Sequence, residues 1–177
     1  MIQERSISVV FDEEAIRQRI ERLASEIAVS LPQDLLVVAI LKGSYVFAAD
    51  LLRAMHRHGM TPEVEFIELS SYREATVSSG QVRVVKDIES DVRGRRVMVL
   101  DDILESGRTL AFAKDLLMAR GAAQVAICVM LEKPKKRAVQ IDADYVGFIS
   151  PDYFLVGYGM DVAHRYRQLP FIGKVDD

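Results

Sequence analysis

The sequence predicts an α/β fold, with an open, mainly parallel twisted sheet flanked by helices. Apolar runs of strand length alternate with segments in which apolar residues recur at helical spacing. Strands that alternate with helices in this way form parallel sheets through right-handed crossover connections. Because such sheets bind ligands beyond the carboxyl ends of their strands, the residues after each strand are the first candidates for a functional site.

The first half of the chain is predicted to form two helices and three strands. Asp12 can cap the first helix, in which Ile16 and Ile20 begin an apolar stripe that ends before Pro32. Residues 70–80 are polar and rich in Ser and Thr, which predicts a mobile loop. The predicted elements are a helix over 12–30, a strand over 35–41, a helix from about 45 to 58 capped by Gly59, a strand over 64–69 and an edge strand over 81–86.

The second half continues the alternation. Arg93, Gly94 and Arg95 form a predicted turn, and Gly121 closes the helix that follows the next strand. The tail, residues 151–177, is predicted to be irregular. The predicted elements are a strand over 96–100, a helix over 109–120, and strands over 124–131 and 145–149.

Composition limits the classes of function. The 177 residues are enough for one hydrophobic core, so we expect a single domain over 1–177. The net charge of −3 argues against a nucleic-acid partner held by bulk charge. Cys128, the only cysteine, lies in an apolar run, which favours a buried, unreactive thiol in a reducing compartment. The sequence has no signal peptide and no apolar run of membrane-spanning length, so we expect a cytoplasmic protein with no membrane partner.

The most informative segment follows the predicted strand over 96–100. Two acids, Asp101 and Asp102, come directly after the strand. The polar start of the next helix consists of Glu105, Ser106, Gly107, Arg108 and Thr109. Free backbone N–H groups, hydroxyls and the helix dipole favour a bound anion there, although a capped helix with a tight turn has the same pattern. Adjacent carboxylates are costly unless they pair, bind a cation or accept hydrogen bonds from ligand hydroxyls.

Other motifs carry less information. The chain has no P-loop sequence, and Gly157 and Gly159 lack the third glycine of a dinucleotide fingerprint because residue 162 is Val162. The three histidines do not have the spacing of zinc ligands. The charge run over 132–137 is typical of a solvated turn, and Lys133 is the one residue in it that we single out, since it lies next to a strand end.

Taken together, these segments resemble the purine phosphoribosyltransferases of the hypoxanthine-guanine type, from about residue 37 to residue 169. The stretch from Asp101 to Leu110 is similar to the family's phosphoribosyl-diphosphate motif. The other similar segments are the diphosphate loop and first helix (41–44 and 49–52), the flexible lid (70–72 and 78–80), and the base and metal segments (133–134, 151–158, Asp161 and Arg167). The resemblance implies a type I phosphoribosyltransferase fold with a small hood built from the chain ends.

The resemblance also implies a reaction in purine salvage. The 5-phosphoribosyl group of 5-phospho-α-D-ribose 1-diphosphate would be transferred to hypoxanthine, guanine or both, with release of diphosphate. The segment 105–109 would hold the 5′-phosphate, and Asp101 and Asp102 would hold the ribose hydroxyls. Closure of a lid containing Ser71 and Tyr72 would exclude water from the activated sugar.

The diphosphate end of the donor is assigned by the same resemblance. The backbone at Lys42 and Gly43, whose peptide bond is often cis in the family, would face the diphosphate, and Arg167 would contact it. Asp161, together with the two adjacent acids, would bind Mg²⁺, which neutralises the leaving group.

For the base, the resemblance implies that Phe154 stacks on the purine, although without the motif Phe154 would be interpreted as a core aromatic. Lys133 would donate to the 6-oxo group, which selects hypoxanthine or guanine over adenine, and the backbone at Leu155 would meet the Watson–Crick edge. The carboxylate of Glu105 would share or remove the proton at purine N7.

The chain departs from the family pattern at Glu105, where the family usually has aspartate. Two alternatives stay open: a nucleotide-sensing, RNA-binding regulator on the same fold, and a transferase for xanthine or adenine. The regulator requires a basic face, and Lys135, Lys136 and Arg137 form the only dense basic cluster. We expect small-molecule substrates, no nucleic-acid partner and a homodimer or homotetramer, as is usual for the family.

Overall fold

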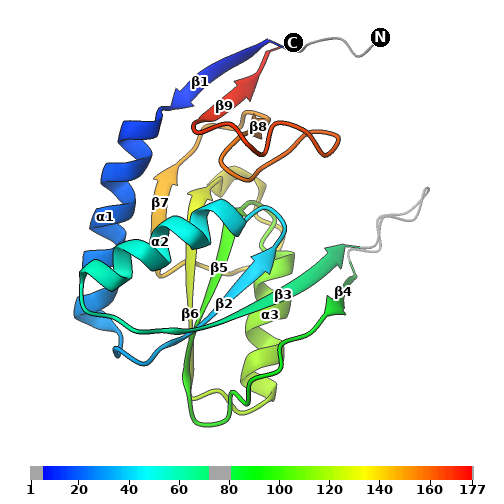
Figure 1. Ribbon diagram of the computed structural model, residues 1–177. Helices are drawn as coiled ribbons and strands as arrows, with labels where there is room; N and C mark the ends of the chain where they lie inside the picture. The colour runs from blue at the N-terminus through cyan, green and yellow to red at the C-terminus, as the bar shows by residue number, and fades with distance from the viewer. Residues whose placement is uncertain (1–5, 72–80, 177) are drawn as a thin grey trace.

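The computed structural model describes residues 6–71 and 81–176, which form two sheets and three α-helices (Figure 1). In the larger sheet every neighbouring pair of strands is parallel except β3 and β4. Its strands, in spatial order, are β4 (Val82–Lys86), β3 (Glu63–Ser71), β2 (Leu36–Leu41), β5 (Arg96–Leu104), β6 (Gln124–Glu132) and β7 (Tyr145–Ile149). The predicted open, mainly parallel sheet is confirmed.

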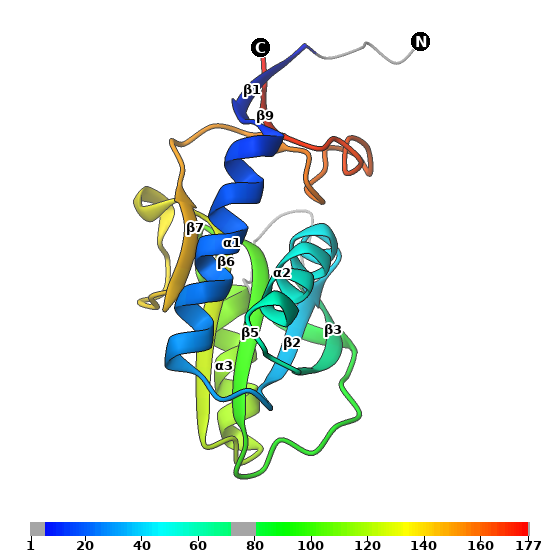
Figure 2. The ribbon, with the colours of Figure 1, turned by 60° about the vertical axis from the view of Figure 1, so that its left-hand side comes forward.

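Helices cover both faces of this sheet (Figures 1 and 2). The helices are α1 (Glu13–Ser30) and α2 (Tyr45–Arg57) on one face and α3 (Arg108–Ala119) on the other. In β2, Val37 and Ala39 enter the core under α1 and α2, whereas Val38 and Ile40 enter the core under α3. Because both faces are buried, the strand is apolar at every position, and this is why a continuous apolar run predicted it correctly.

The two chain ends form a second, antiparallel sheet, which we call the hood together with residues 157–171. Its strands are β1 (Ile7–Phe11), β9 (Ile172–Val175) and β8 (Leu155–Val156). The hood lies beyond the carboxyl ends of β2, β5 and β6 (Figure 1). The prediction that the whole tail is irregular is wrong, because β9 pairs with β1, whose Ile7 lies opposite Val175.

Some observed bounds differ from the predicted ones because pairing with a neighbour extends a strand. β5 continues to Leu104, since Asp101, Ile103 and Leu104 pair with β6. The two acids therefore lie within the last part of the strand rather than after it. β3 continues through Ser70 and Ser71, which pair with β4, while 72–80 of the predicted loop lie outside the described residues. Within the described ranges, no helix combines the length and apolar character needed to span a membrane.

Candidate active site

Two neighbouring cavities lie at the carboxyl edge of the large sheet. One, of about 260 Å³, lies at the start of α3, and the other, of about 410 Å³, lies against residues 152–155. Asp102, Ile103 and Glu105 line both cavities, so the end of β5 forms a shared wall. A ligand with two differently shaped parts can therefore occupy both cavities at once and present their junction to these side chains.

The smaller cavity has the geometry of an anion site. Glu105, Ser106, Gly107 and Thr109 line it, and Gly107 has a φ of 82° directly before the first residue of α3. A side chain at Gly107 is excluded, because a Cβ there would lie 2.6 Å from Cγ2 of Ile141. The unpaired N–H groups of the first helical turn and the helix dipole favour an anion at this position.

Arg108 is placed differently from the rest of its motif. Its side chain is exposed and does not line the cavity, whereas its backbone N–H lies 3.4 Å from Oγ of Ser106. The assignment of Arg108 to the 5′-phosphate segment therefore stays a prediction, and it cannot involve the side chain in the position seen here. Its place as the first residue of α3, where the backbone N–H points along the helix axis, is consistent with a backbone contribution.

The adjacent acids at the end of β5 lie in a buried environment that disfavours their charged forms. Asp101 is 8% exposed, and burial together with the charge of Asp102 raises its pKa well above the usual range for an aspartate. Burial also raises the pKa of Asp102, and hydrogen bonds from Asp101 and from backbone N–H groups oppose that rise. The N–H of Asp102 donates to Oδ1 of Asp101 at 2.9 Å. A cation or ligand hydroxyls at this pair would offset the cost of burying the charge.

The loop between β2 and α2 approaches this acid pair closely. Gly43 lines the smaller cavity, and a Cβ added to it would lie 1.9 Å from Oδ2 of Asp102. Lys42 is exposed and is not among the lining residues. The cis peptide bond of the loop joins Leu41 to Lys42, at the last paired residue of β2, and not Lys42 to Gly43 as expected. Of the two predicted loop residues, the structure thus brings Gly43 into the cavity wall.

The larger cavity combines a buried lysine with an exposed aromatic ring. Lys133 is 6% exposed, and its Nζ lies 3.4 Å from Oε1 of Glu105. Its backbone N–H donates to the carbonyl of Leu104 at 2.9 Å, which fixes the end of β6 against β5. Phe154 is 58% exposed, so the interpretation of Phe154 as a core aromatic is wrong, and Leu155 beside it begins β8. A flat apolar ligand can stack on the exposed ring while Lys133 donates to its edge.

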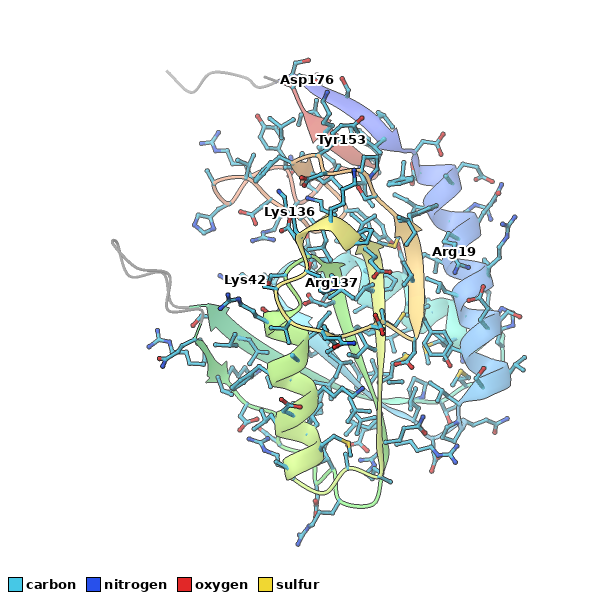
Figure 3. The ribbon with its side chains drawn as sticks, turned by 180° about the vertical axis from the view of Figure 1, so that it is seen from behind. Arg19, Lys42, Lys136, Arg137, Tyr153 and Asp176 are labelled. Atoms are coloured by element: carbon cyan, nitrogen blue, oxygen red, sulfur yellow. The ribbon has the colours of Figure 1, made fainter. Side chains whose placement is uncertain are left out.

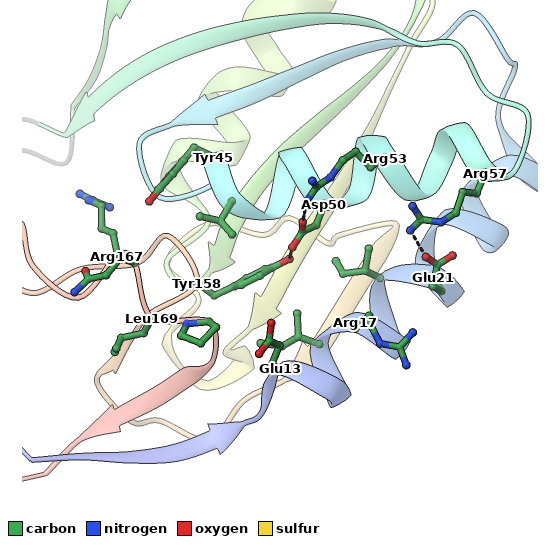
Figure 4. A pocket seen from close by; sticks show the side chains of 15 residues that line it. Glu13, Arg17, Glu21, Tyr45, Asp50, Arg53, Arg57, Tyr158, Arg167 and Leu169 are labelled. Atoms are coloured by element: carbon green, nitrogen blue, oxygen red, sulfur yellow. Dashed lines mark hydrogen bonds and ion pairs between the residues drawn. The ribbon is translucent and has the colours of Figure 1, made fainter.

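Asp161 and Arg167 form an ion pair within the hood. Nη2 of Arg167 lies 2.7 Å from Oδ1 of Asp161, and Nη1 donates to the carbonyl of Gly159 at 2.6 Å. Asp161 lines the larger cavity together with Asp102, and its predicted role as a metal ligand stays a prediction. Arg167 instead lines a separate hollow of about 630 Å³ between the hood, α1 and α2 (Figure 4). The positive charge of Arg167 still acts on Asp102, where it opposes the rise in pKa that burial causes. The structure therefore does not place Arg167 in the wall of either of the two adjoining cavities.

Sequence patterns missed the side chains that hold the site together from distant parts of the chain. Tyr158 is 4% exposed, has a φ of 50°, and donates its O–H to Oδ2 of Asp50 at 2.6 Å (Figure 4). This bond fixes the turn of the hood to α2. Next to it, a Cβ at Gly159 would lie 2.3 Å from the carbonyl oxygen of Gly43. The hydroxyl of a buried tyrosine usually has a hydrogen-bond partner, but nothing in the sequence indicates which residue that is.

The charge run over 132–137 is not a solvated turn throughout. It contains a 3-10 helix, η1 (Pro134–Lys136), and Nη2 of Arg137 lies 2.5 Å from Oε1 of Glu132. Nη1 of Arg137 donates to the carbonyl of Glu105 at 3.1 Å, and the N–H groups of the next two residues donate to the carbonyl of Ser106. This segment therefore holds the backbone of Glu105 and Ser106 in the wall of the smaller cavity, a role that the local sequence does not indicate.

Three further expectations concern the cysteine, the metal ligands and the lid. Cys128 is buried, and burial raises the pKa of its thiol, which agrees with an unreactive cysteine. No group of three or more His, Cys, Asp or Glu side chains with metal-ligand geometry occurs among the described residues. Of the predicted lid, Ser70 and the backbone of Ser71 are described, at the end of β3, and Tyr72 lies outside the described residues. The lid therefore stays a prediction.

A parallel sheet with an anion site after one strand, a buried acid pair and a base-sized cavity beside it is the arrangement expected of a phosphoribosyltransferase. Residues 6–163 match the family of the phosphoribosyl transferase domain, and the chain belongs to this family. The predicted resemblance to the hypoxanthine-guanine type is also confirmed by relatives of similar length. The hypoxanthine phosphoribosyltransferase of Escherichia coli K12 is 38% identical over 173 residues, which are 96% of each chain. The hypoxanthine-guanine phosphoribosyltransferase of Bacillus subtilis is 41% identical over 167 residues, which are 93% of this chain and 91% of the relative.

A longer relative and a solved structure extend the comparison. The bifunctional protein TilS/HprT of Listeria monocytogenes is 43% identical over 166 residues, and the chain spans only 25% of that protein's length. A hypoxanthine phosphoribosyltransferase structure from Trypanosoma cruzi superimposes with a TM-score of 0.91 at 35% identity, and the match covers 99% of this chain and 94% of that one. A hypoxanthine phosphoribosyltransferase from Staphylococcus aureus gives a TM-score of 0.89 at 36% identity, with 96% and 91% covered.

Proposed function

We propose that the chain transfers the 5-phosphoribosyl group of 5-phospho-α-D-ribose 1-diphosphate to hypoxanthine or guanine, releasing diphosphate and the nucleoside 5′-monophosphate. This is a reaction of purine salvage, and the relatives named for it match nearly the whole chain. One observation carries the proposal at this site: the anion cavity and the base-sized cavity share the wall formed by Asp102, Ile103 and Glu105. The bond that is made joins sugar to base, so it must form at such a junction.

The donor occupies the smaller cavity in this proposal. The backbone and hydroxyls of residues 105–109 bind the 5′-phosphate, as the helix start favours. Asp101 and Asp102 accept hydrogen bonds from the ribose hydroxyls. Gly43, which lies against Asp102, brings the backbone of the loop toward the diphosphate, and Lys42 belongs to the same loop. Arg167 reaches the diphosphate only if it leaves its contact with Asp161.

The acceptor base occupies the larger cavity. Atoms O6 and N7 lie on the same edge of a 6-oxopurine, where O6 accepts and a protonated N7 donates. Lys133 is a donor and Glu105 an acceptor, and their Nζ and Oε1 atoms lie 3.4 Å apart, so the pair matches that edge. Adenine presents an amino group where Lys133 needs an acceptor, and a buried donor without a partner is strongly disfavoured. Phe154 stacks on the ring, and the backbone at Leu155 meets its Watson–Crick edge.

Glu105 acts as the general base for the proton at N7. Removal of that proton raises the electron density of the base as the bond to C1 of the ribose forms and diphosphate leaves. The adjacent acids lie on the ribose side of the same wall, where positive charge develops on the sugar. The carboxylate of Glu105 remains 40% exposed in the free protein, which leaves it accessible to an incoming base.

The acidic residues also fit a bound Mg²⁺, which supplies neutralisation of the charge that develops on the diphosphate. Magnesium is usually held by one or two carboxylates, with substrate phosphates and water completing its ligands. Asp161, Asp101 and Asp102 provide only oxygen donors, and burial of uncompensated carboxylates at the pair favours a cation. Because no group of three such side chains occurs among the described residues, one or two of these carboxylates would hold the metal together with the phosphates of the donor.

No structural observation favours the RNA-binding regulator. Of its candidate basic cluster, Lys136 pairs with Asp152 and Arg137 with Glu132, so two of the three charges already have acidic partners. We further propose a cytoplasmic homodimer or homotetramer made of one domain. In the enzyme from Trypanosoma cruzi, the C-terminal region has a role in oligomeric state and enzymatic activity. Light scattering on the purified protein would measure the oligomeric state of this chain directly.

The test offers hypoxanthine, guanine, xanthine, adenine and uracil separately with phosphoribosyl diphosphate and Mg²⁺, and measures diphosphate release. We expect release with hypoxanthine or guanine alone. Release only with another base would overturn the base-site assignment, and no release with any base would overturn the proposed function.

Replacing Glu105 by Gln tests the base directly. The amide keeps the size of the side chain but cannot accept the proton, so we expect kcat to fall by about 10²- to 10⁴-fold. Affinity for phosphoribosyl diphosphate, measured by calorimetry, should change far less. An unchanged kcat would remove Glu105 from the mechanism, and Glu105→Asp shows by its rate whether the longer side chain costs turnover.

A further inference from the structure

Lys136 lines the larger cavity and forms ion pairs with two other residues of its wall. Its Nζ lies 2.8 Å from Oδ1 of Asp152 and 3.7 Å from Oε1 of Glu105. Figure 3 shows Lys136 at η1, on the side that faces the segment carrying Tyr153. The bridge joins two parts of the cavity wall that are far apart in sequence: the end of β5 and the segment that carries Phe154.

The contacts to Glu105 are one-sided. Both Lys133 and Lys136 approach the same oxygen, Oε1, at 3.4 Å and 3.7 Å. Among the described residues, the one side-chain hydrogen bond to the Glu105 carboxylate is made to Oε1. Two cations on one oxygen restrict the rotation of the carboxylate while they leave the other oxygen available to accept a proton.

Such restraint matters more for this chain than for one with aspartate at position 105. Glutamate has one more rotatable bond than aspartate, and ordering it costs additional side-chain entropy. The Glu105 side chain is 40% exposed, so packing alone does not hold it. When a 6-oxopurine binds, Lys133 turns one or more of its donors to the 6-oxo group, and Lys136 remains as the cation that faces the carboxylate.

We propose that Lys136 is a positioning residue for phosphoribosyl transfer, which holds the carboxylate of Glu105 at the junction of the two cavities and ties it to Asp152. The inference rests on the proposed function, in which Glu105 takes the purine proton. Asp152 raises the pKa of Lys136, and Glu105 adds to this effect, so the bridging group stays cationic. Lys136 in turn lowers the pKa of Asp152.

The test compares Lys136→Met with Lys136→Arg and Lys135→Met. Methionine keeps much of the length of the side chain and removes its charge, arginine keeps the charge, and Lys135 is the neighbouring lysine, which forms no ion pair with either carboxylate in the described chain. Exposed ion pairs contribute at most about 1 kcal/mol, so we expect Lys136→Met to lower kcat by about fivefold. The KM for phosphoribosyl diphosphate and the urea midpoint should be unchanged. Arginine should restore most of kcat, and Lys135→Met should keep all of it.

The same substitution in a Glu105→Asp background separates the two contacts of Lys136. The shorter carboxylate is withdrawn from Lys136, so Lys136→Met should lower kcat by less than about twofold there. The proposal would be overturned if Lys136→Met lowered kcat equally in both backgrounds. It would also be overturned if Lys136→Met left kcat unchanged in the protein with Glu105, or changed only the KM for the purine. If the parent protein is inactive with every base, the proposed function itself fails, which is a distinct result.

Discussion

Gly43→Ala tests the contact between the diphosphate loop and the acid pair. The new Cβ would lie 1.9 Å from Oδ2 and 2.6 Å from Cγ of Asp102, whereas ordinary van der Waals contact begins at 3.4 Å. The carboxyl group or the loop must therefore move by about 1.5 Å. Gly43 is not among the glycines with positive φ, so alanine fits its backbone and the effect comes from the added methyl group.

The expected magnitude follows from that displacement. Misplacing a catalytic or binding group by about 1 Å costs about 10²-fold in rate, which corresponds to about 2.7 kcal/mol. We therefore expect kcat/KM for phosphoribosyl diphosphate to fall by about 10²-fold. Inserting a methyl group into a packed region also costs about 1–3 kcal/mol of stability, so unfolding must be measured with the kinetics.

Gly59→Ala is the matched control, because it adds the same methyl group where no atom lies within 4 Å but where φ is 79°. It should lower the free energy of unfolding by about 1–2 kcal/mol through backbone strain and leave kcat/KM unchanged. Initial rates of diphosphate release and urea unfolding curves, measured on both variants, separate site geometry from stability. If kcat/KM of Gly43→Ala lies within twofold of the parent value, the reasoning is refuted, because the rate would then not depend on the position of the Asp102 carboxyl group.

Two further predictions concern stability. Asp101→Asn should make the free energy of unfolding less dependent on pH. The pKa of Asp101 is raised in the folded chain, so the parent protein loses stability as the pH rises through the folded-state pKa of this group. The variant has no carboxyl group at this position and lacks this loss. Urea unfolding between about pH 4 and pH 8 measures the difference, and parallel pH curves would contradict it. Tyr158→Phe removes the 2.6 Å hydrogen bond to Asp50 and should lower the free energy of unfolding by about 1–3 kcal/mol, also in urea. A change near zero would show that the bond does not fix the hood to α2.

The large sheet could be predicted because its signals are local. The central strands are buried on both faces, so each is a continuous apolar run, and the polar residues between them mark the connections. The hood strands have no such signal. β8 has two residues and pairs with β9, which contains Gly173, and β9 in turn pairs with β1 from the other end of the chain, where Ile7 lies opposite Val175. Their structure is therefore decided by pairing across the whole chain, which local pattern cannot reveal.

The candidate site divides in the same way. The residues from Asp101 to Thr109 could be predicted because one strand and one helix start bring them together in sequence order. The sequence predicts a solvated turn around Arg137 because it does not indicate its partners, which are Glu132 at the end of β6 and the carbonyl of Glu105 just after β5. A charge run has the same composition whether its members face water or support a loop, so only the packing distinguishes the two.

The substitution of glutamate for the family's usual aspartate shows why composition and geometry must be argued together. From the sequence, Glu105 keeps the charge of an aspartate and adds length, and nothing in the local motif indicates what that length does. In the structure, the added length brings the carboxylate between Lys133, at the end of β6, and Lys136, on η1. A longer acid that rotated freely would lower the catalytic rate, since each additional rotamer lowers the fraction of time that the carboxylate spends in the productive position. Because two cations hold one of its oxygens, the longer acid can be ordered as well as a shorter one, and the departure at residue 105 and the lysine at residue 136 are then best understood as one feature of this chain.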